Sequence, residues 1–168
     1  LPPGGRILCA VSGGADSVCL LHLLRRQAEE VGFSLFAAHY DHQLRGEEST
    51  RDASFVENLC REWQIPLTLG RGDVAGEARR RRAGLEETAR EMRYAFLEET
   101  ARTLDCSLIA TAHNADDNVE TALLHLIRGA GLQGLSGMAP RRGSLIRPLL
   151  STGRAEIVEY LRQENLPY

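Results

Sequence analysis

Short apolar runs alternate with longer amphipathic segments along nearly the whole chain. The apolar runs, which we expect to form buried strands, cover residues 6–11, 33–39, 65–69, 107–111 and 145–146. Strands that alternate with helices in this way form βαβ units, in which helices cover a parallel sheet. The sequence therefore predicts an α/β fold with an open parallel sheet of about five strands flanked by helices.

Segments of helical period lie between the expected strands. Apolar residues recur there every three or four positions, which is the spacing of one face of a helix. The stripes are Leu21, Leu24, Ala28 and Val31; Ala53, Val56, Cys60 and Trp63; Leu85, Ala89, Met92 and Phe96; and Val119, Leu123 and Leu126. A fifth helix is expected from about residue 152 to just before Pro167.

Four consecutive Arg, residues 79–82, form the only charge run. They fall inside the longest connection between the expected elements, so we expect them in an exposed loop. An Arg run in such a loop can contact a phosphate backbone without reading sequence.

The chain has no Lys, and all 20 of its Lys and Arg positions are Arg. This composition excludes Schiff-base chemistry, a pyridoxal-phosphate anchor and the Lys of a Walker A loop. Any phosphate group must therefore be held by backbone amides, by Arg or by a metal ion.

Length and cysteine content favour one globular domain over residues 1–168, in a reducing, cytoplasmic setting. The four Cys form no C-x-x-C pair, so neither a zinc knuckle nor a redox dithiol is indicated. No apolar stretch is long enough to cross a bilayer, and no membrane partner is expected. The chain opens without Met and stops straight after a helical pattern, so we expect it to belong to a longer protein.

The turn after the first expected strand has the composition of a phosphate site. It reads Ser12, Gly13, Gly14, Ala15, Asp16 and Ser17. Glycines allow backbone amides to approach an oxyanion, and the N-terminus of the next helix adds partial positive charge. The plainer interpretation is a polar turn in which Asp16 or Ser17 caps the helix. The run is longer and more particular than a cap requires, which favours a phosphate cradle.

Two other motif matches are weak. Residues 10–14 resemble the nucleophile elbow of α/β-hydrolases, with His113 as the base, but no upstream segment is available to donate the oxyanion amide. Residues 129–134 match G-x-G-x-x-G, yet they follow a helix rather than a strand and so cannot form a dinucleotide-binding turn.

Polar residues also follow the second expected strand. His39, Asp41 and His42 lie at the carboxyl edge of the sheet, where open α/β sheets bind ligands. Together with His113 and Asp117 they would suit a metal-dependent phosphohydrolase, which we keep as an alternative. The plainer interpretation is that this segment only fixes the loop before the second helix.

A His and two carboxylates share one helix face after the fourth expected strand. His113, Asp117 and Glu120 are spaced by four and three residues, at the same sheet edge as the phosphate cradle. Acidic residues in a first turn also complement the helix dipole, but this location favours a site. Arg90 and Arg93 likewise share a face of the third helix, where surface charge is the plainer interpretation.

The motifs of this chain resemble those of the tRNA(Ile)-lysidine synthetase family, within the PP-loop (N-type) ATP pyrophosphatases. Residues 12–17 resemble the PP-loop itself, which GMP synthetases, argininosuccinate synthetases and tRNA thiolases share. The narrower resemblance is carried in family order by residues 41–45, 85–94, 111–121, 128–132 and 147–150. The thiolases usually need Cys, often as C-x-x-C, so the lack of such a pair favours lysidine synthesis.

The resemblance implies a Rossmann-like PP-loop ATP pyrophosphatase fold and a two-step reaction that uses ATP and Mg²⁺. The C2 carbonyl oxygen of the wobble cytidine, in tRNA(Ile) with a CAU anticodon, attacks the α-phosphate of ATP and pyrophosphate leaves. The ε-amine of L-lysine then attacks C2 and displaces AMP. Family tRNA-binding domains would follow Tyr168, and a homodimer is left open.

The same resemblance assigns roles to individual residues. The PP-loop residues bind ATP, with Asp16 as a Mg²⁺ ligand. Arg93 and His113 lie near the ATP phosphates or the adenylate, and Asp117 and Glu120 lie on the lysine side. The expected substrate-binding residues are Asp41, His42, Arg45 and Arg90.

Position 15 is Ala, where other members of the superfamily often carry Lys. Arg93, the metal and backbone amides are therefore expected to neutralise more of the phosphate charge.

Besides the phosphohydrolase, a third functional hypothesis for the chain is a module that binds ATP without turning it over.

Overall fold

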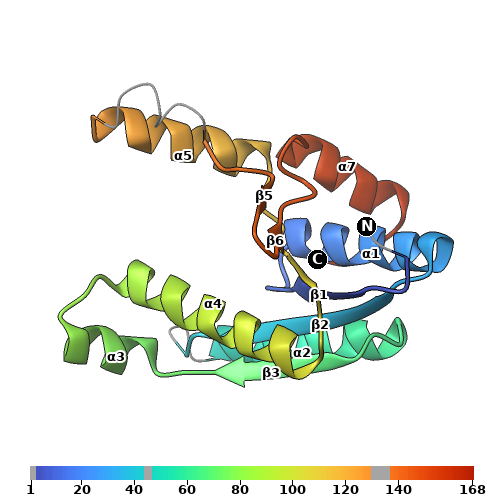
Figure 1. Cartoon of the computed structure of the whole chain (residues 1–168), viewed down its shortest axis with the longest axis horizontal. Coiled ribbons are helices and arrows are strands. Elements are labelled where there is room, and N and C mark those ends of the chain that lie inside the picture. The colour runs from blue at the N-terminus through green and yellow to red at the C-terminus, as the bar shows by residue number, and fades with distance from the viewer. Residues whose placement is uncertain (1–2, 44–46, 130–136) are drawn as a thin grey trace.

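One six-stranded sheet forms the centre of the molecule in the computed structural model, which describes residues 3–43, 47–129 and 137–168 (Figure 1). The strand order is β3-β2-β1-β4-β6-β5. The parallel strands are β1 (Arg6–Ala10), β2 (Ser34–Asp41), β3 (Leu67–Arg71), β4 (Leu108–Ala110) and β6 (Leu145–Ile146). They confirm the five expected strands. The sequence did not predict β5 (Arg141–Arg142), an antiparallel edge strand of two charged residues with no apolar run.

The helices follow the strands as the helical period predicts. They are α1 (Ala15–Val31), α2 (Glu47–Glu62), α4 (Leu85–Thr103), α5 (Ala115–Ile127) and α7 (Arg154–Gln163), with one addition, α3 (Val74–Arg81). Within the described ranges, none of these helices combines the length and the apolar character needed to cross a membrane.

Both faces of the central strand β1 are buried over residues 7–9, which explains the continuous apolar sequence that follows Arg6. Ile7 and Cys9 point into the larger core, which α1, α2 and α7 cover. Leu8 points the opposite way, into a smaller core where it packs with Leu97 and Ala101 of α4. Alternate residues of a strand face opposite sides, so α1 and α4 lie on opposite faces of the sheet.

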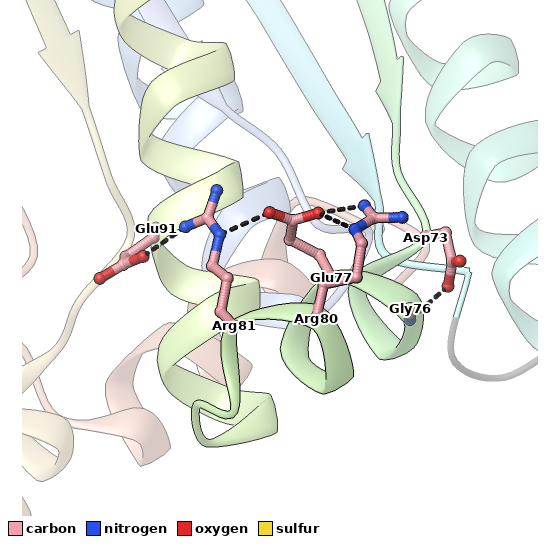
Figure 2. A network of polar contacts seen from close by, with 6 residues as sticks. All are labelled: Asp73, Gly76, Glu77, Arg80, Arg81 and Glu91. Carbon is pink, nitrogen blue, oxygen red and sulfur yellow. Dashed lines mark hydrogen bonds and ion pairs between the residues drawn. The ribbon is translucent and has the colours of Figure 1, made fainter.

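The Arg run is helical, so the expectation that residues 79–82 lie in a loop is wrong. Arg79, Arg80 and Arg81 form the last turn of α3, and Arg82 ends the helix with a left-handed φ of 53°. Figure 2 shows Glu77 bound to Arg80 and Arg81, and Arg81 also reaching Glu91 of α4 at 3.1 Å. Arg is a good helix former, and cations at a helix C-terminus interact favourably with its dipole.

Helix α5 lies outside the core, although its sequence carries an apolar stripe. Val119 is 58% exposed, Leu123 53% and Leu126 51%, and none of its residues is buried. Figure 1 shows α5 extending away from the sheet on the α7 side. Its first turn is fixed to the start of α7, because the Ala115 N–H donates to the Thr152 carbonyl at 3.0 Å.

Candidate active site

A cavity of about 480 Å³ lies at the carboxyl ends of β1, β2 and β4. Six segments far apart in sequence line it: the turn between β1 and α1, the end of β2, α2 at one residue, the middle of α4, the turn from β4 into α5, and the start of α7. The carboxyl edge of an open parallel sheet is where ligands bind in such folds. The predicted residues on its walls are Ser12, Gly14, Ala15, Asp16, Ser17, Asp41, His42, Arg93, His113 and Asp117.

One buried hydroxyl group, that of Ser17, makes several hydrogen bonds that hold the turn between β1 and α1 together. Ser17 Oγ accepts hydrogen bonds from the N–H groups of Ser12 at 3.2 Å and Gly13 at 3.1 Å, and it donates to the Gly14 carbonyl at 2.8 Å. Gly13 has a φ of +99°, which glycine adopts more easily than any other residue. Gly14 then begins α1 without a side-chain cap, so the first N–H groups of the helix are available to an anion.

Asp16 carries a free carboxylate oxygen at this helix start. Its Oδ1 is buried and has no hydrogen-bond partner within the described structure, while its Oδ2 lies 3.8 Å from a guanidinium nitrogen of Arg154. Carboxylate oxygens are the ligands that Mg²⁺ prefers. Asp16 is therefore suited to supply one carboxylate ligand to a Mg²⁺ ion at this helix start.

The end of β2 places two predicted residues in the cavity wall, and a third residue, His39, bonds to the end of β1. Asp41 and His42 line the cavity, and the His42 ring lies edge-on to Tyr40 with ring centroids 5.1 Å apart. Burial, with the Arg93 charge, lowers the pKa of His42. His39 is 5% exposed and its Nδ1 lies 2.8 Å from the Val11 carbonyl, so it braces the end of β1.

In the residues that the structure describes, no three His, Cys, Asp or Glu side chains form a group that could hold a metal ion. The cluster of His39, Asp41, His42, His113 and Asp117 considered for a phosphohydrolase is therefore not formed. The one metal ligand left among the predicted residues is Asp16.

His113 is a neutral base in the cavity wall. Its Nδ1 lies 3.0 Å from Thr111 Oγ1, and burial together with the nearby Arg147 charge lowers its pKa to about 4. Asp117 lies one turn further on. Its Oδ2 accepts the Asn114 N–H at 3.0 Å, and Asn114 Oδ1 accepts the Asp117 N–H at 2.9 Å.

Of the predicted residues that the structure describes, three do not line the cavity: Gly13, Arg90 and Glu120. Arg90 is exposed, with its guanidinium 5.2 Å from the centre of the Tyr94 ring, and Glu120 is exposed on α5. Arg45 lies outside the described residues, as do residues 130–134 of the G-x-G-x-x-G match. The cavity therefore assembles Arg93, His113 and Asp117 without Glu120.

Sequence reasoning missed Arg154 and Asp52, which also line the cavity. Arg154 is the first residue of α7, directly after the N-cap Gly153. The residue type of Arg154 could have indicated a role in the site, since only Arg can supply a side-chain cation in this chain apart from His. The sequence could not indicate its position in the cavity, because that position depends on how α7 packs.

Comparisons with known proteins find a family model and relatives that match nearly the whole chain. Residues 2–168 match the family model of the PP-loop domain. The tRNA(Ile)-lysidine synthase of Dehalococcoides mccartyi (strain CBDB1) is 46% identical over 97% of this chain and 36% of the relative. Those of Thermotoga maritima and Chlorobaculum tepidum are 45% and 44% identical, over 100% and 97% of this chain and 40% and 49% of the relatives. The chain thus spans less than half the length of these three relatives.

Solved structures support the fold. The U34-tRNA thiolase NcsA from Methanococcus maripaludis superposes with a TM-score of 0.81 at 19% identity, over 100% of this chain and 59% of that chain. The NH3-dependent NAD synthetase from Campylobacter jejuni superposes with a TM-score of 0.65 at 20% identity, over 98% and 65%. At this level of identity the likeness concerns the architecture alone.

Proposed function

The chain belongs to the PP-loop domain family, and from this membership we propose that it is the catalytic part of a tRNA(Ile)-lysidine synthase. It would join L-lysine to C2 of the wobble cytidine of tRNA(Ile) with a CAU anticodon, in the cytoplasm, and release AMP and pyrophosphate. The observation that carries the proposal is one cavity in which the PP-loop faces Arg93, His113 and Asp117. The identity of 44–46% to three synthases of that name supports it.

The first step is the attack of the cytidine O2 on the α-phosphate of ATP. The bond from the α-phosphorus to the bridging oxygen breaks, and negative charge moves onto pyrophosphate. The free N–H groups at the start of α1 and the Arg93 guanidinium can stabilise that charge. Asp16 would hold Mg²⁺ through its free Oδ1, and the bound ion would neutralise phosphate charge.

The second step is the attack of the lysine Nζ on C2, which breaks the bond from C2 to the AMP oxygen. The ammonium must first lose a proton, and Asp117 is the carboxylate of the predicted pair that lines the cavity. Neutral His113 can accept or donate one hydrogen bond through Nε2 while Nδ1 is engaged with Thr111. We therefore assign lysine binding to Asp117 and orientation of the adenylate to His113.

The test follows labelled ATP in the presence of Mg²⁺ and unmodified tRNA(Ile), with and without lysine. We expect AMP and pyrophosphate only when tRNA is present, and labelled lysine in the RNA. A tRNA(Ile) transcript with U in place of the wobble C is the matched control and should give neither product. ADP, or AMP that is indifferent to tRNA and lysine, would contradict the proposal.

The likeness to a U34-tRNA thiolase raises a second candidate, a tRNA thiolase. That thiolase was solved with its 4Fe-4S cluster. Here Cys9, Cys19 and Cys60 are buried and Cys106 is partly buried, and none of them is among the described residues that line the cavity. Burial also raises the pKa of Cys19 and of Cys60 to about 11, which disfavours the thiolates that bind metal. Sulfur in the product tRNA would support this candidate instead.

A further inference from the structure

Two guanidinium groups supply the cavity with side-chain cations in the described structure, Arg93 and Arg154. Because the chain has no Lys, the phosphate charges of ATP must be met by these groups, by backbone amides or by metal. Arg93 acts electrostatically on His42 and His113. Arg154 lies instead at the phosphate cradle, 3.8 Å from Asp16.

The two groups reach the cavity from opposite faces of the sheet. Arg93 belongs to α4, which packs on the smaller core. Arg154 begins α7, whose Ile157 and Leu161 are 1% and 0% exposed in the larger core, beside α1. Figure 1 shows α7 running over α1. The two guanidinium groups therefore enter the same cavity from different elements.

The backbone of Arg154 is fixed although its side chain is exposed. Its N–H donates to Asp116 Oδ2 at 2.8 Å, which joins the first turns of α5 and α7. The N–H of the preceding Gly153 donates to Glu156 Oε2 at 2.8 Å, which orders the start of α7. A flexible cation is thus held at a defined point on the rim of the cradle.

We propose that Arg154 binds the β- and γ-phosphates of ATP and then the released pyrophosphate. This assignment rests on the proposed function, because it gives a role within that same site. A guanidinium fork can donate two parallel hydrogen bonds to phosphate oxygens, and it meets charge that grows on the leaving group during the first step. The adjacent Asp16 leaves Oδ1 free for Mg²⁺, so cation and metal would face the same phosphates.

The competing explanation is that Arg154 only forms an ion pair with Asp16. The pair is long, at 3.8 Å, and the Arg154 side chain is 66% exposed. Exposed ion pairs contribute little to stability, so the ion pair alone gives little reason for Arg at this position. The two explanations differ in what the loss of Arg154 does to ligand binding.

The experiment measures binding of inorganic pyrophosphate with Mg²⁺, and separately of AMP, by titration calorimetry on the wild type and on three variants. Arg154→Ala should weaken pyrophosphate binding by about tenfold or more, since hydrogen bonds to charged groups are worth that much. AMP binding and the unfolding temperature should not change. Arg154→Lys should recover part of the affinity, because it keeps the charge but not the fork. Arg162→Ala, on the same helix with a side chain 77% exposed, is the control and should bind as the wild type.

The proposal is overturned if the wild type does not bind pyrophosphate, or if Arg154→Ala binds it as tightly as the wild type does. It is equally overturned if Arg162→Ala shows the same loss, or if AMP binding falls as much as pyrophosphate binding. The titration contains neither tRNA nor lysine. The binding result for Arg154 is therefore independent of the activity test, and it would remain valid if the protein failed to form lysidine.

Discussion

Asn114 and Asp117 cap the start of α5 for each other. Each side chain accepts the backbone N–H of the other residue, at 2.9 and 3.0 Å. Asp117 therefore has a structural contact through Oδ2 and a place in the cavity wall at the same time. Substitutions at Asp117 affect both roles unless they are chosen to separate them.

Asp117→Asn should separate these roles. The amide oxygen can still accept the Asn114 N–H, so the free energy of unfolding should stay close to the wild-type value, while lysine transfer falls because the charge is lost. Asp117→Ala should lose lysine transfer and also about 1 kcal/mol of stability, the usual effect of losing a cap. Urea unfolding and lysine incorporation into tRNA measure the two effects. Equal unfolding of Asn and Ala variants would show that the reciprocal cap contributes nothing.

Arg93→Ala should lower the rate of AMP formation by about 100-fold, the usual effect of removing one transition-state donor. Its free energy of unfolding should change by less than about 0.5 kcal/mol, because Arg93 is only partly buried. Arg102→Ala is the control on the same helix, with an exposed side chain paired to Glu99. An Arg93→Ala protein that melts as the wild type does and still produces AMP at the wild-type rate would remove Arg93 from the site.

The lowered pKa of His113 predicts that the protein loses stability in mild acid. Its pKa is lowered from 6.5 to about 4 by burial and by Arg147, so the unfolded chain takes up the proton first as the pH falls. Stability from neutral His113 is complete above about pH 6.5 and declines as the pH falls toward 4. We expect wild type to lose more unfolding free energy than His113→Asn between about pH 7 and pH 5. Parallel pH curves for the two proteins would show that the shift is absent.

Gly13 and Gly14 should respond differently to Ala. Gly13 has a φ of +99°, so Gly13→Ala should cost about 1–2 kcal/mol of stability by backbone strain. At Gly14 an added Cβ has room, with Ser12 Oγ its nearest neighbour at 3.9 Å, and stability should not change. Because Gly14 lines the cavity, Gly14→Ala should weaken ATP binding instead. The comparison needs thermal unfolding and a nucleotide titration, and equal unfolding temperatures would refute the strain argument.

The exposed side chains of Arg79 and Arg82 predict a salt-dependent contact with RNA. In the described structure both are exposed at the end of α3 without an ion-pair partner, unlike Arg80 and Arg81. If they contact phosphates, the Arg79→Ala, Arg82→Ala double variant should bind tRNA more weakly and reduce the salt slope by about one per lost contact. The matched control removes Arg102 and Arg162, which changes net charge equally. The same slope in both variants would place the RNA elsewhere.

The five parallel strands and the PP-loop could be predicted because local sequence determines them. A strand segment buried on both faces must be continuously apolar, and residues 7–10 of β1 are. A turn that binds anions at a helix start needs glycine, and Gly13 adopts a positive φ there. These signals depend on neighbours in sequence, so they survive without knowledge of the tertiary structure.

The remaining features depend on tertiary packing. The charge of residues 79–82 indicates exposure and so favours a loop, yet exposure is compatible with a helix whose other face is buried at Val74 and Ala78. Glu120 shares a helix face with Asp117, but a helix rises about 4.5 Å in three residues, and this carries Glu120 beyond the cavity wall. Arg154 enters the site only because α7 packs on α1.

The choice of guanidinium for both cavity cations has a chemical consequence for the enzyme itself. In the proposed reaction an adenylated cytidine would be attacked by an amine, and a lysine side chain in the cavity wall would compete with the incoming amino acid. The guanidinium groups of Arg93 and Arg154, which line the cavity, are poor nucleophiles. With no Lys in residues 1–168, this domain would offer the activated base of the proposed reaction no ε-amine of its own, and the side reaction of that base with the cavity wall would be avoided.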